Sequence, residues 1–167
     1  TAASTLVGAM HLIKKGSEQI SLVVPSDQYF EDNDYANKIF TDSAMHHNHQ
    51  SITIFGIKIT RPSTSYGYII PSNNIDTEPP LVDKFVEKPN QEEAKALSKH
   101  KDSMWNCGVF LFEPNDLLNK YKLLSPHLAD SVERSYKEAT VDADKVYLCN
   151  NHWSSCKNIS IDYEILQ

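Results

Sequence analysis

The chain has 167 residues and a formal net charge of −6 at pH 7, with 40% hydrophobic and 23% charged residues. This composition is typical of a soluble globular domain, and the negative charge argues against nucleic acid as a partner. No apolar run approaches the roughly 20 residues of a membrane span. The three scattered cysteines (Cys107, Cys149 and Cys156) and the lack of a visible secretory signal predict a cytoplasmic protein without a disulfide framework.

The first half of the chain alternates helical and extended patterns. Apolar residues at helical spacing predict a helix over residues 6–14, which Gly16 ends. The apolar run 20–24 is short and continuous, which is typical of a strand buried on both faces in a parallel sheet. The next predicted elements are a helix over 34–44 and strands over 51–59 and 66–70.

The second half continues this alternation. A polar stretch, 71–80, leads into a strand over 81–86, and Asn90 with Glu93 forms a capping box that begins a helix to about His100. The remaining elements are a strand over 105–112, helices over 115–121 and 126–139, extended pieces at 146–148 and 159–161, and a first helical turn at 162–167.

This order of elements predicts an α/β fold, with a mixed, mostly parallel sheet layered by helices. No linker divides residues 1–167, which are expected to form one domain. The chain begins at Thr1 and stops within a helix-like turn. We therefore expect a partial domain taken from a longer polypeptide.

Polar residues stand where predicted strands end, which is where open α/β sheets bind ligands. Ser26 and Asp27 follow the first strand, Glu87 and Lys88 end the fourth, and Asp162 follows the last. Singly, each has an ordinary explanation: a turn residue or helix cap for the two aspartates, and a solvated ion pair for Glu87 and Lys88. Only in combination do they indicate a site.

The combination resembles the sugar-phosphate nucleotidyltransferases, and most closely the mannose-1-phosphate guanylyltransferases (GDP-mannose pyrophosphorylases). FVEKP by itself is a modest signal, because related enzymes that use other sugars also carry it. The PSD loop, the Tyr66–Gly67–Tyr68–Ile69 run, WN-x-G and SIDY point to the mannose enzymes. The matching stretches, which span Thr1 to Leu166 in the order of the family, are TAASTLVGAMHLI, LVVPSDQYFED, TIFGIKITRPSTSYGYI, VDKFVEKP, WNCGVFLF and SIDYEIL.

The resemblance implies a Rossmann-like nucleotidyltransferase fold, of which residues 1–167 are the central part of the catalytic domain. It implies an enzyme that makes GDP-mannose and pyrophosphate from GTP and mannose-1-phosphate. The reaction would be in-line attack of a sugar-phosphate oxygen on the α-phosphorus of GTP. Both substrates are small molecules. The resemblance leaves open whether the protein forms a homodimer.

The resemblance also assigns roles on the sugar side of the site. Glu87 would accept hydrogen bonds from sugar hydroxyls, and Lys88 would neutralise the sugar phosphate as a catalytic residue. Asn106 would contact the sugar, while the backbone of Tyr66 and Gly67 would line the pocket. Asn106 has a simpler explanation, that it satisfies a bulged backbone.

On the nucleotide side, the resemblance implies that Ser26 and Asp27 contact the nucleotide. Asp27, also catalytic, would hold a Mg²⁺ together with Asp162, since carboxylate and phosphate oxygens are the usual ligands of Mg²⁺.

Some positions depart from the family pattern. The loop at Pro62–Ser65 lacks a usual Glu and Gly, Gln28 replaces a His, and Cys107 stands where Ser is common. The Gly-rich nucleotide loop of the family lies upstream of the matched region, and the five glycines here form no phosphate-cradling run. We therefore expect these 167 residues to be inactive alone, and the alternative function is a non-catalytic sugar-nucleotide-binding module.

Four other polar arrangements are discounted. His46, His47 and His49 are expected at a solvated helix end and turn, and Asp142-x-Asp144 in a polar turn. Cys149-x-x-His152-x-x-x-Cys156 has passable zinc spacing but lacks a fourth ligand in sequence. A Cys–His nucleophilic pair has no supporting motif.

Overall fold

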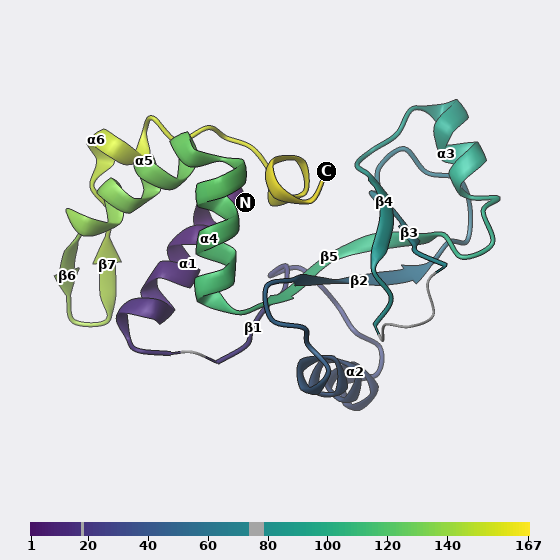
Figure 1. Ribbon diagram of the computed structural model, residues 1–167, viewed down its shortest axis with the longest axis horizontal. Helices are drawn as coiled ribbons and strands as arrows, with labels where there is room; N and C mark the ends of the chain where they lie inside the picture. Colours follow the sequence, from purple (N-terminus) through teal and green to yellow (C-terminus); the bar gives the residue numbers. More distant parts are fainter. Residues whose placement is uncertain (18, 74–78) are drawn as a thin grey trace. The chain divides into compact units, whose positions relative to one another are not determined.

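The computed structural model describes residues 1–17, 19–73 and 79–167, which form two compact units (Figure 1). A helical unit consists of Thr1–Gln19 and Glu113–Leu166. A sheet unit consists of Ile20–Phe112, together with Gln167. Within the described residues, no helix has both the length and the apolar character that crossing a membrane requires.

The helical unit is built around α1 (Ala2–Lys14), α4 (Pro114–Leu124) and α5 (Pro126–Lys137), and α1 contacts both of the others. These three helices confirm the predicted helices in this unit. The buried residues of α1 follow the spacing of one helix face, because side chains three or four positions apart share a face. They are Ala2, Thr5, Leu6, Ala9 and Met10.

The rest of the helical unit differs in part from the prediction. A hairpin of β6 (Thr140–Asp142) and β7 (Lys145–Tyr147) leads to the short helix α6 (Asn150–Trp153). Asp142 ends β6 and Asp144 lies in the two-residue turn, together with Ala143, whose φ is 50°.

The chain ends in a π-helical turn, η1 (Asp162–Leu166), so the expected terminal helical turn is present. The predicted strand at 159–161 is wrong. Its backbone bonds the start of α1 instead: Ala2 N donates to Ile159 O at 3.1 Å, and Ile161 N donates to Thr1 Oγ1 at 3.2 Å.

The sheet unit has β5 (Met104–Phe112) as its central strand. One edge of β5 pairs with β2 (Ile52–Lys58). The other edge pairs with β1 (Ser21–Val23) near Phe112 and with β3 (Tyr68–Pro71) near Met104, and β3 pairs in turn with β4 (Val82–Val86). Figure 1 shows β5 running alongside β2.

The α/β class is confirmed, but the expectation of a mostly parallel sheet is wrong. Every strand pairing among residues 1–17, 19–73 and 79–167 is antiparallel. Because β1, β2 and β3 all run antiparallel to β5, they are parallel to one another, as the alternation with helices predicted. These three strands are not neighbours in the sheet. β5 lies between β1 and β2, and β1 and β3 pair with different ends of β5. The run 20–24 is also not buried on both faces, since Leu22 is 38% exposed.

A bulge interrupts β5 at its middle. Between the pairs Ile54–Phe110 and Gly56–Asn106, Phe55 alone on β2 faces three residues on β5. The middle residue of these three, Gly108, has a φ of 74°, which glycine adopts without steric cost. The strand therefore changes direction between its two halves.

Outside residues 74–78, the sheet unit also contains the helices α2 (Asn33–Met45) and α3 (Gln91–Leu97). The capping box of α3 is confirmed. Asn90 Oδ1 accepts from the backbone N–H groups of Glu92 and Glu93, both at 3.0 Å, and Glu93 Oε2 accepts from Asn90 N at 3.2 Å. The helix ends at Leu97, earlier than predicted, where Leu97 packs in the core with Tyr68 and Trp105.

Candidate active site

Three of the predicted sugar-binding residues meet on the sheet unit. The backbone N–H of Asn106 donates to the carbonyl of Gly67 at 2.8 Å. A Cβ on Gly67 would lie 2.5 Å from Glu87 Oε2 and 3.3 Å from Asn106 Cβ. Glu87 and Asn106 are both buried. A Cβ at position 67 would therefore force the end of the Glu87 side chain to move.

Glu87 and Lys88 form an asymmetric ion pair at the end of β4. Lys88 Nζ lies 2.9 Å from Glu87 Oε1, and the two side chains are 51% and 5% exposed. The ordinary explanation of a solvated ion pair is therefore wrong for Glu87, whose carboxylate is buried. Such a carboxylate is costly unless it is paired or hydrogen-bonded.

Lys88 itself adopts an uncommon backbone conformation. Its φ of 44° lies in the left-handed region, which costs a residue other than glycine roughly 1–2 kcal/mol. Strain of this kind clusters at functional sites. It coincides here with a turn that leaves the ammonium half-exposed beside a buried carboxylate.

The Asn106 side chain also accepts a hydrogen bond from the backbone of the bulge, as the simpler explanation predicted. Its Oδ1 accepts a hydrogen bond from Gly108 N at 3.1 Å. The side-chain oxygen is thus committed to the backbone of β5, and contact between Asn106 and a sugar stays a prediction.

The residues before β3 have a defined path despite their departure from the family pattern. The hydroxyl of Tyr68 accepts from Ser63 N and donates to Ser63 O, each at 2.9 Å, so it holds the loop from both sides. The ring of Tyr66 lies 4.8 Å from that of Trp105, centroid to centroid, and remains 41% exposed. Tyr66 therefore presents an aromatic face to solvent next to the buried residue Gly67.

The predicted nucleotide and metal residues lie on different units. Ser26 and Asp27 form an exposed turn after β1 in the sheet unit. The preceding residue, Pro25, lies near the bulge, with Cγ 3.5 Å from where a Cβ on Gly108 would stand. Asp162 begins η1 in the helical unit and is half-buried. Sharing of one ion by Asp27 and Asp162 stays a prediction.

The chemistry of the two carboxylates fits Mg²⁺, which prefers hard oxygen donors. Tyr121 lies near both Asp162 and Glu164 in the helical unit. Burial, then the charges of Glu164 and Asp162, raise the pKa of Tyr121 far above its ordinary value. The Tyr121 hydroxyl keeps its proton and donates it to Ala2 O at 2.9 Å.

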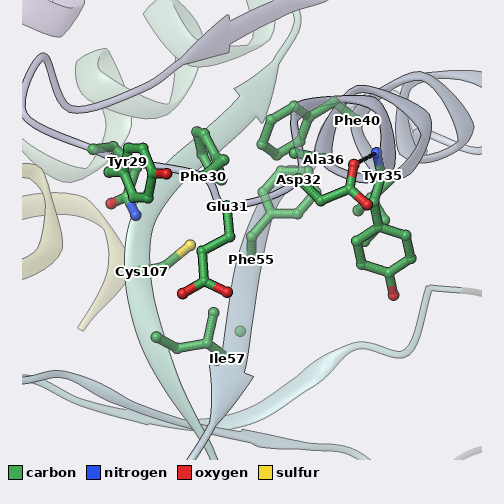
Figure 2. Close-up of a pocket in the computed structure, with 13 residues that line it drawn as sticks. Tyr29, Phe30, Glu31, Asp32, Tyr35, Ala36, Phe40, Phe55, Ile57 and Cys107 are labelled. Atoms are coloured by element: carbon green, nitrogen blue, oxygen red, sulfur yellow. Dashed lines mark hydrogen bonds between the residues drawn. The ribbon is translucent and has the colours of Figure 1, made fainter.

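A separate pocket of about 440 Å³ lies on the sheet unit between α2, β2 and the bulge of β5 (Figure 2). Its aromatic wall is a chain of edge-to-face contacts, with ring centroids 5.6 Å apart for Phe30 and Phe40 and 5.1 Å for Phe40 and Phe55. Glu31 and Asp32 add negative charge at the lining.

Cys107 also lines this pocket, and burial raises the pKa of its thiol despite opposing backbone hydrogen bonds. The sequence did not reveal the pocket, because it predicted only a helix over 34–44, which contains the lining residues Ile39 and Phe40. The adjacent pair Tyr29 and Phe30 after the PSD turn was the available signal.

The histidines end α2, as predicted, but not all are solvated. His46 Nδ1 lies 2.8 Å from the carbonyl of Asp42, whereas His47 is buried with Nδ1 3.0 Å from Thr53 Oγ1. These contacts explain His46 and His47 as structural residues.

Comparison with known proteins identifies the family. Residues 1–154 match the nucleotidyl transferase family, and the chain belongs to it. The chain is 32% identical over 168 residues to a mannose-1-phosphate guanylyltransferase of Sinorhizobium fredii, and 30% identical over 167 residues to the xanthan biosynthesis protein XanB of Xanthomonas campestris. All of the chain is covered in both cases, yet it spans only about a third of these relatives, 33% and 35% of their length.

Two solved structures have the same fold. The first is titled a mannose-1-phosphate geranyltransferase of Thermus thermophilus. It is 27% identical with a TM-score of 0.82, over 99% of this chain and 46% of that one. The second, a mannose-6-phosphate isomerase of Helicobacter pylori, has a TM-score of 0.84 over 100% of this chain and 64% of that one. Its 24% identity supports the fold alone.

Proposed function

We propose that the protein is a mannose-1-phosphate guanylyltransferase, which makes GDP-mannose and pyrophosphate from GTP and mannose-1-phosphate. Family membership supports the reaction class, and the name of the Sinorhizobium relative supports the sugar and the base. The observation that carries the proposal is the arrangement at the end of β4, where Gly67, Glu87 and Asn106 converge beside the Lys88 ammonium.

This arrangement suits a ligand with hydroxyls at one end and a phosphate at the other. The buried carboxylate of Glu87 accepts hydrogen bonds from sugar hydroxyls, because a charged acceptor binds a donor more strongly than a neutral one does. The Lys88 ammonium reaches solvent and meets the phosphate. When the ligand binds, its hydroxyls and phosphate replace part of the attraction between Glu87 and Lys88. The ion pair therefore orients both side chains before the ligand arrives.

On the nucleotide side, Ser26 and Asp27 contact the triphosphate, and Asp27 and Asp162 hold Mg²⁺. When bound, the ion supplies positive charge to the phosphates. The residues of this chain position the reactants, which is most of what a protein contributes to phosphoryl-type transfer.

The test is the kinetics of Lys88 variants in the full-length protein. Lys88→Ala and Lys88→Gly should each raise the KM for mannose-1-phosphate, because one charge-assisted contact of about 1.5–3 kcal/mol is lost, roughly tenfold to a hundredfold. Pyrophosphate release with Mg²⁺ gives the rates. Lys84→Ala, which removes an exposed ammonium from β4 itself, is the matched control.

The glycine variant separates function from folding. Glycine accepts the left-handed φ of position 88, so Lys88→Gly should be more stable than Lys88→Ala by about 1 kcal/mol and yet equally impaired. Unchanged KM values in both variants would reject the role of Lys88. Binding of GDP-mannose without any pyrophosphate release would favour the non-catalytic binding module.

A further inference from the structure

Three side chains that can ligate a transition metal converge where α5 ends and α6 begins. Cys149 Sγ donates to Glu138 Oε2 at 3.3 Å, and His152 Nε2 lies 3.1 Å from Glu138 Oε1. One sulfur, one nitrogen and one carboxylate oxygen all lie within 4.8 Å of one another. None of these residues takes part in the proposed nucleotide transfer. The spacing Cys149-x-x-His152 was visible in the sequence, but Glu138 was not recognised as its companion.

The donor atoms of the three side chains lie close enough together for one ion to bind all of them after the side chains adjust. Zinc lies about 2.3 Å from sulfur and about 2.0–2.2 Å from nitrogen or oxygen, so neighbouring ligand atoms stand roughly 3.3–3.6 Å apart. The contacts of 3.3 Å to Glu138 Oε2 and 3.1 Å to Glu138 Oε1 are close to these values, although they involve different oxygens of the carboxylate. An ion could therefore enter with small movements of the side chains.

The backbone holds the ligands in place. Cys149 N donates to Ser135 O at 3.0 Å, and Ser135 Oγ donates to Cys149 O at 2.9 Å. Ser135 is fully buried in α5, three residues before Glu138, so this clamp ties Cys149 to the same helix that supplies the carboxylate. Cys149 is also the N-cap of α6, and His152 lies three residues further on the same helical turn.

We propose that Glu138, Cys149 and His152 bind a divalent ion of the zinc class, with water in a fourth position. A thiolate, an imidazole and a carboxylate together favour Zn²⁺ over Mg²⁺ or Ca²⁺, which take oxygen ligands. The thiol proton, now donated to Glu138, leaves to solvent as the metal–sulfur bond forms. The ion has access, because the side chains of His152 and Glu138 are 30% and 58% exposed.

Such an ion would fasten the base of the β6–β7 hairpin. The hairpin lies between Glu138 and Cys149, so the two ligands stand at its two ends. The proposal does not depend on the transfer reaction, and either can fail without the other.

The test uses metal-free purified protein titrated with Co²⁺, followed by displacement with Zn²⁺. We expect one tightly bound Co²⁺ per chain, with the near-ultraviolet absorption of a thiolate ligand and the visible bands of a tetrahedral ion. Cys149→Ser should remove the thiolate band. Glu138→Gln and His152→Gln should each weaken Co²⁺ binding roughly tenfold or more, since even the supporting partners of metal ligands have effects of that size.

Two variants serve as matched controls. Cys156→Ser removes a nearby thiol outside the cluster, and His127→Gln removes an exposed imidazole from the other end of α5. Both should bind Co²⁺ as the native protein does. Loss of the thiolate band in Cys156→Ser, or its absence in the native protein, would overturn the assignment.

A measurement on the native protein tests the site even where a variant does not fold. Zn²⁺ should slow the alkylation of Cys149 in the native protein and leave the alkylation of Cys107, in the sheet unit, unchanged. Equal rates for Cys149 with and without Zn²⁺ would reject the site.

Discussion

At the scale of single residues, Gly67 and Glu87 depend on each other. A side chain at position 67 would meet three groups at once: Glu87 Oε2 at 2.5 Å, Phe85 Cζ at 3.2 Å and Asn106 Cβ at 3.3 Å. Glu87 keeps its present position beside the chain because no Cβ is there. Gly8 in α1 is the opposite case, since nothing lies within 4 Å of a Cβ built on it.

We therefore predict opposite outcomes for the same substitution at these two positions. Gly67→Ala should cost about 1 kcal/mol of stability, the low end for an overpacked site, because the nearest atom is the movable end of Glu87. It should also raise the KM for mannose-1-phosphate as the carboxylate shifts. Gly8→Ala should add about 1 kcal/mol through helix propensity and leave the kinetics unchanged.

Urea unfolding and pyrophosphate release measure both effects. A Gly67→Ala protein with native stability and native KM would show that the contact between position 67 and Glu87 does not constrain the site.

At the scale of elements, local sequence patterns were enough to predict a helix cap but not to predict which strands pair. The capping box of α3 was predicted from Asn90 and Glu93 because its hydrogen bonds connect residues three apart. The partners of β5 could not be predicted in the same way. Pairs such as Leu22 with Leu111 join distant residues, and an apolar run is compatible with either strand direction.

The same limit applied to the candidate site. The motif at Glu87 and Lys88 was found in the sequence, but the burial of one partner and the left-handed φ of the other were not. The burial of Glu87 involves Gly67 and Asn106, which reach the end of β4 through tertiary contacts.

The capping box gives a prediction for α3. Asn90→Ala should destabilise the protein by about 1 kcal/mol, because the N–H groups of Glu92 and Glu93 lose their acceptor. Asn119→Ala, an exposed position inside α4, should be neutral or slightly stabilising, since alanine is the better helix former. Thermal unfolding of the two variants should shift in opposite directions or by clearly different amounts. Equal losses would contradict a capping role.

At the scale of the whole molecule, the proposed metal ligands Asp27 and Asp162 are carried by different units. A shared Mg²⁺ would make nucleotide transfer depend on both units at once. Because both carboxylates would hold the same ion, losing either ligand should have nearly the effect of losing both.

Accordingly, Asp27→Asn and Asp162→Asn should each abolish turnover of the full-length protein, and the double variant should be little worse than either. Pyrophosphate release across a range of Mg²⁺ concentrations is the measurement. Asp144→Asn, in the turn of the β6–β7 hairpin, is a control that should keep full activity. Independent, multiplying losses would mean that the two carboxylates act separately.

The helical unit is assembled from two distant parts of the chain. Its first helix ends at Lys14, and the next helix that packs against it begins at Pro114, 114 − 14 = 100 positions later. Ribosomes add about 5–20 residues per second, so α1 waits roughly 5–20 s for its partners. During that time the face that carries Leu6 and Met10 has no native cover from α4 or α5. Throughout the synthesis of the sheet unit, the nascent chain thus carries this apolar face without the two helices that cover it in the folded protein.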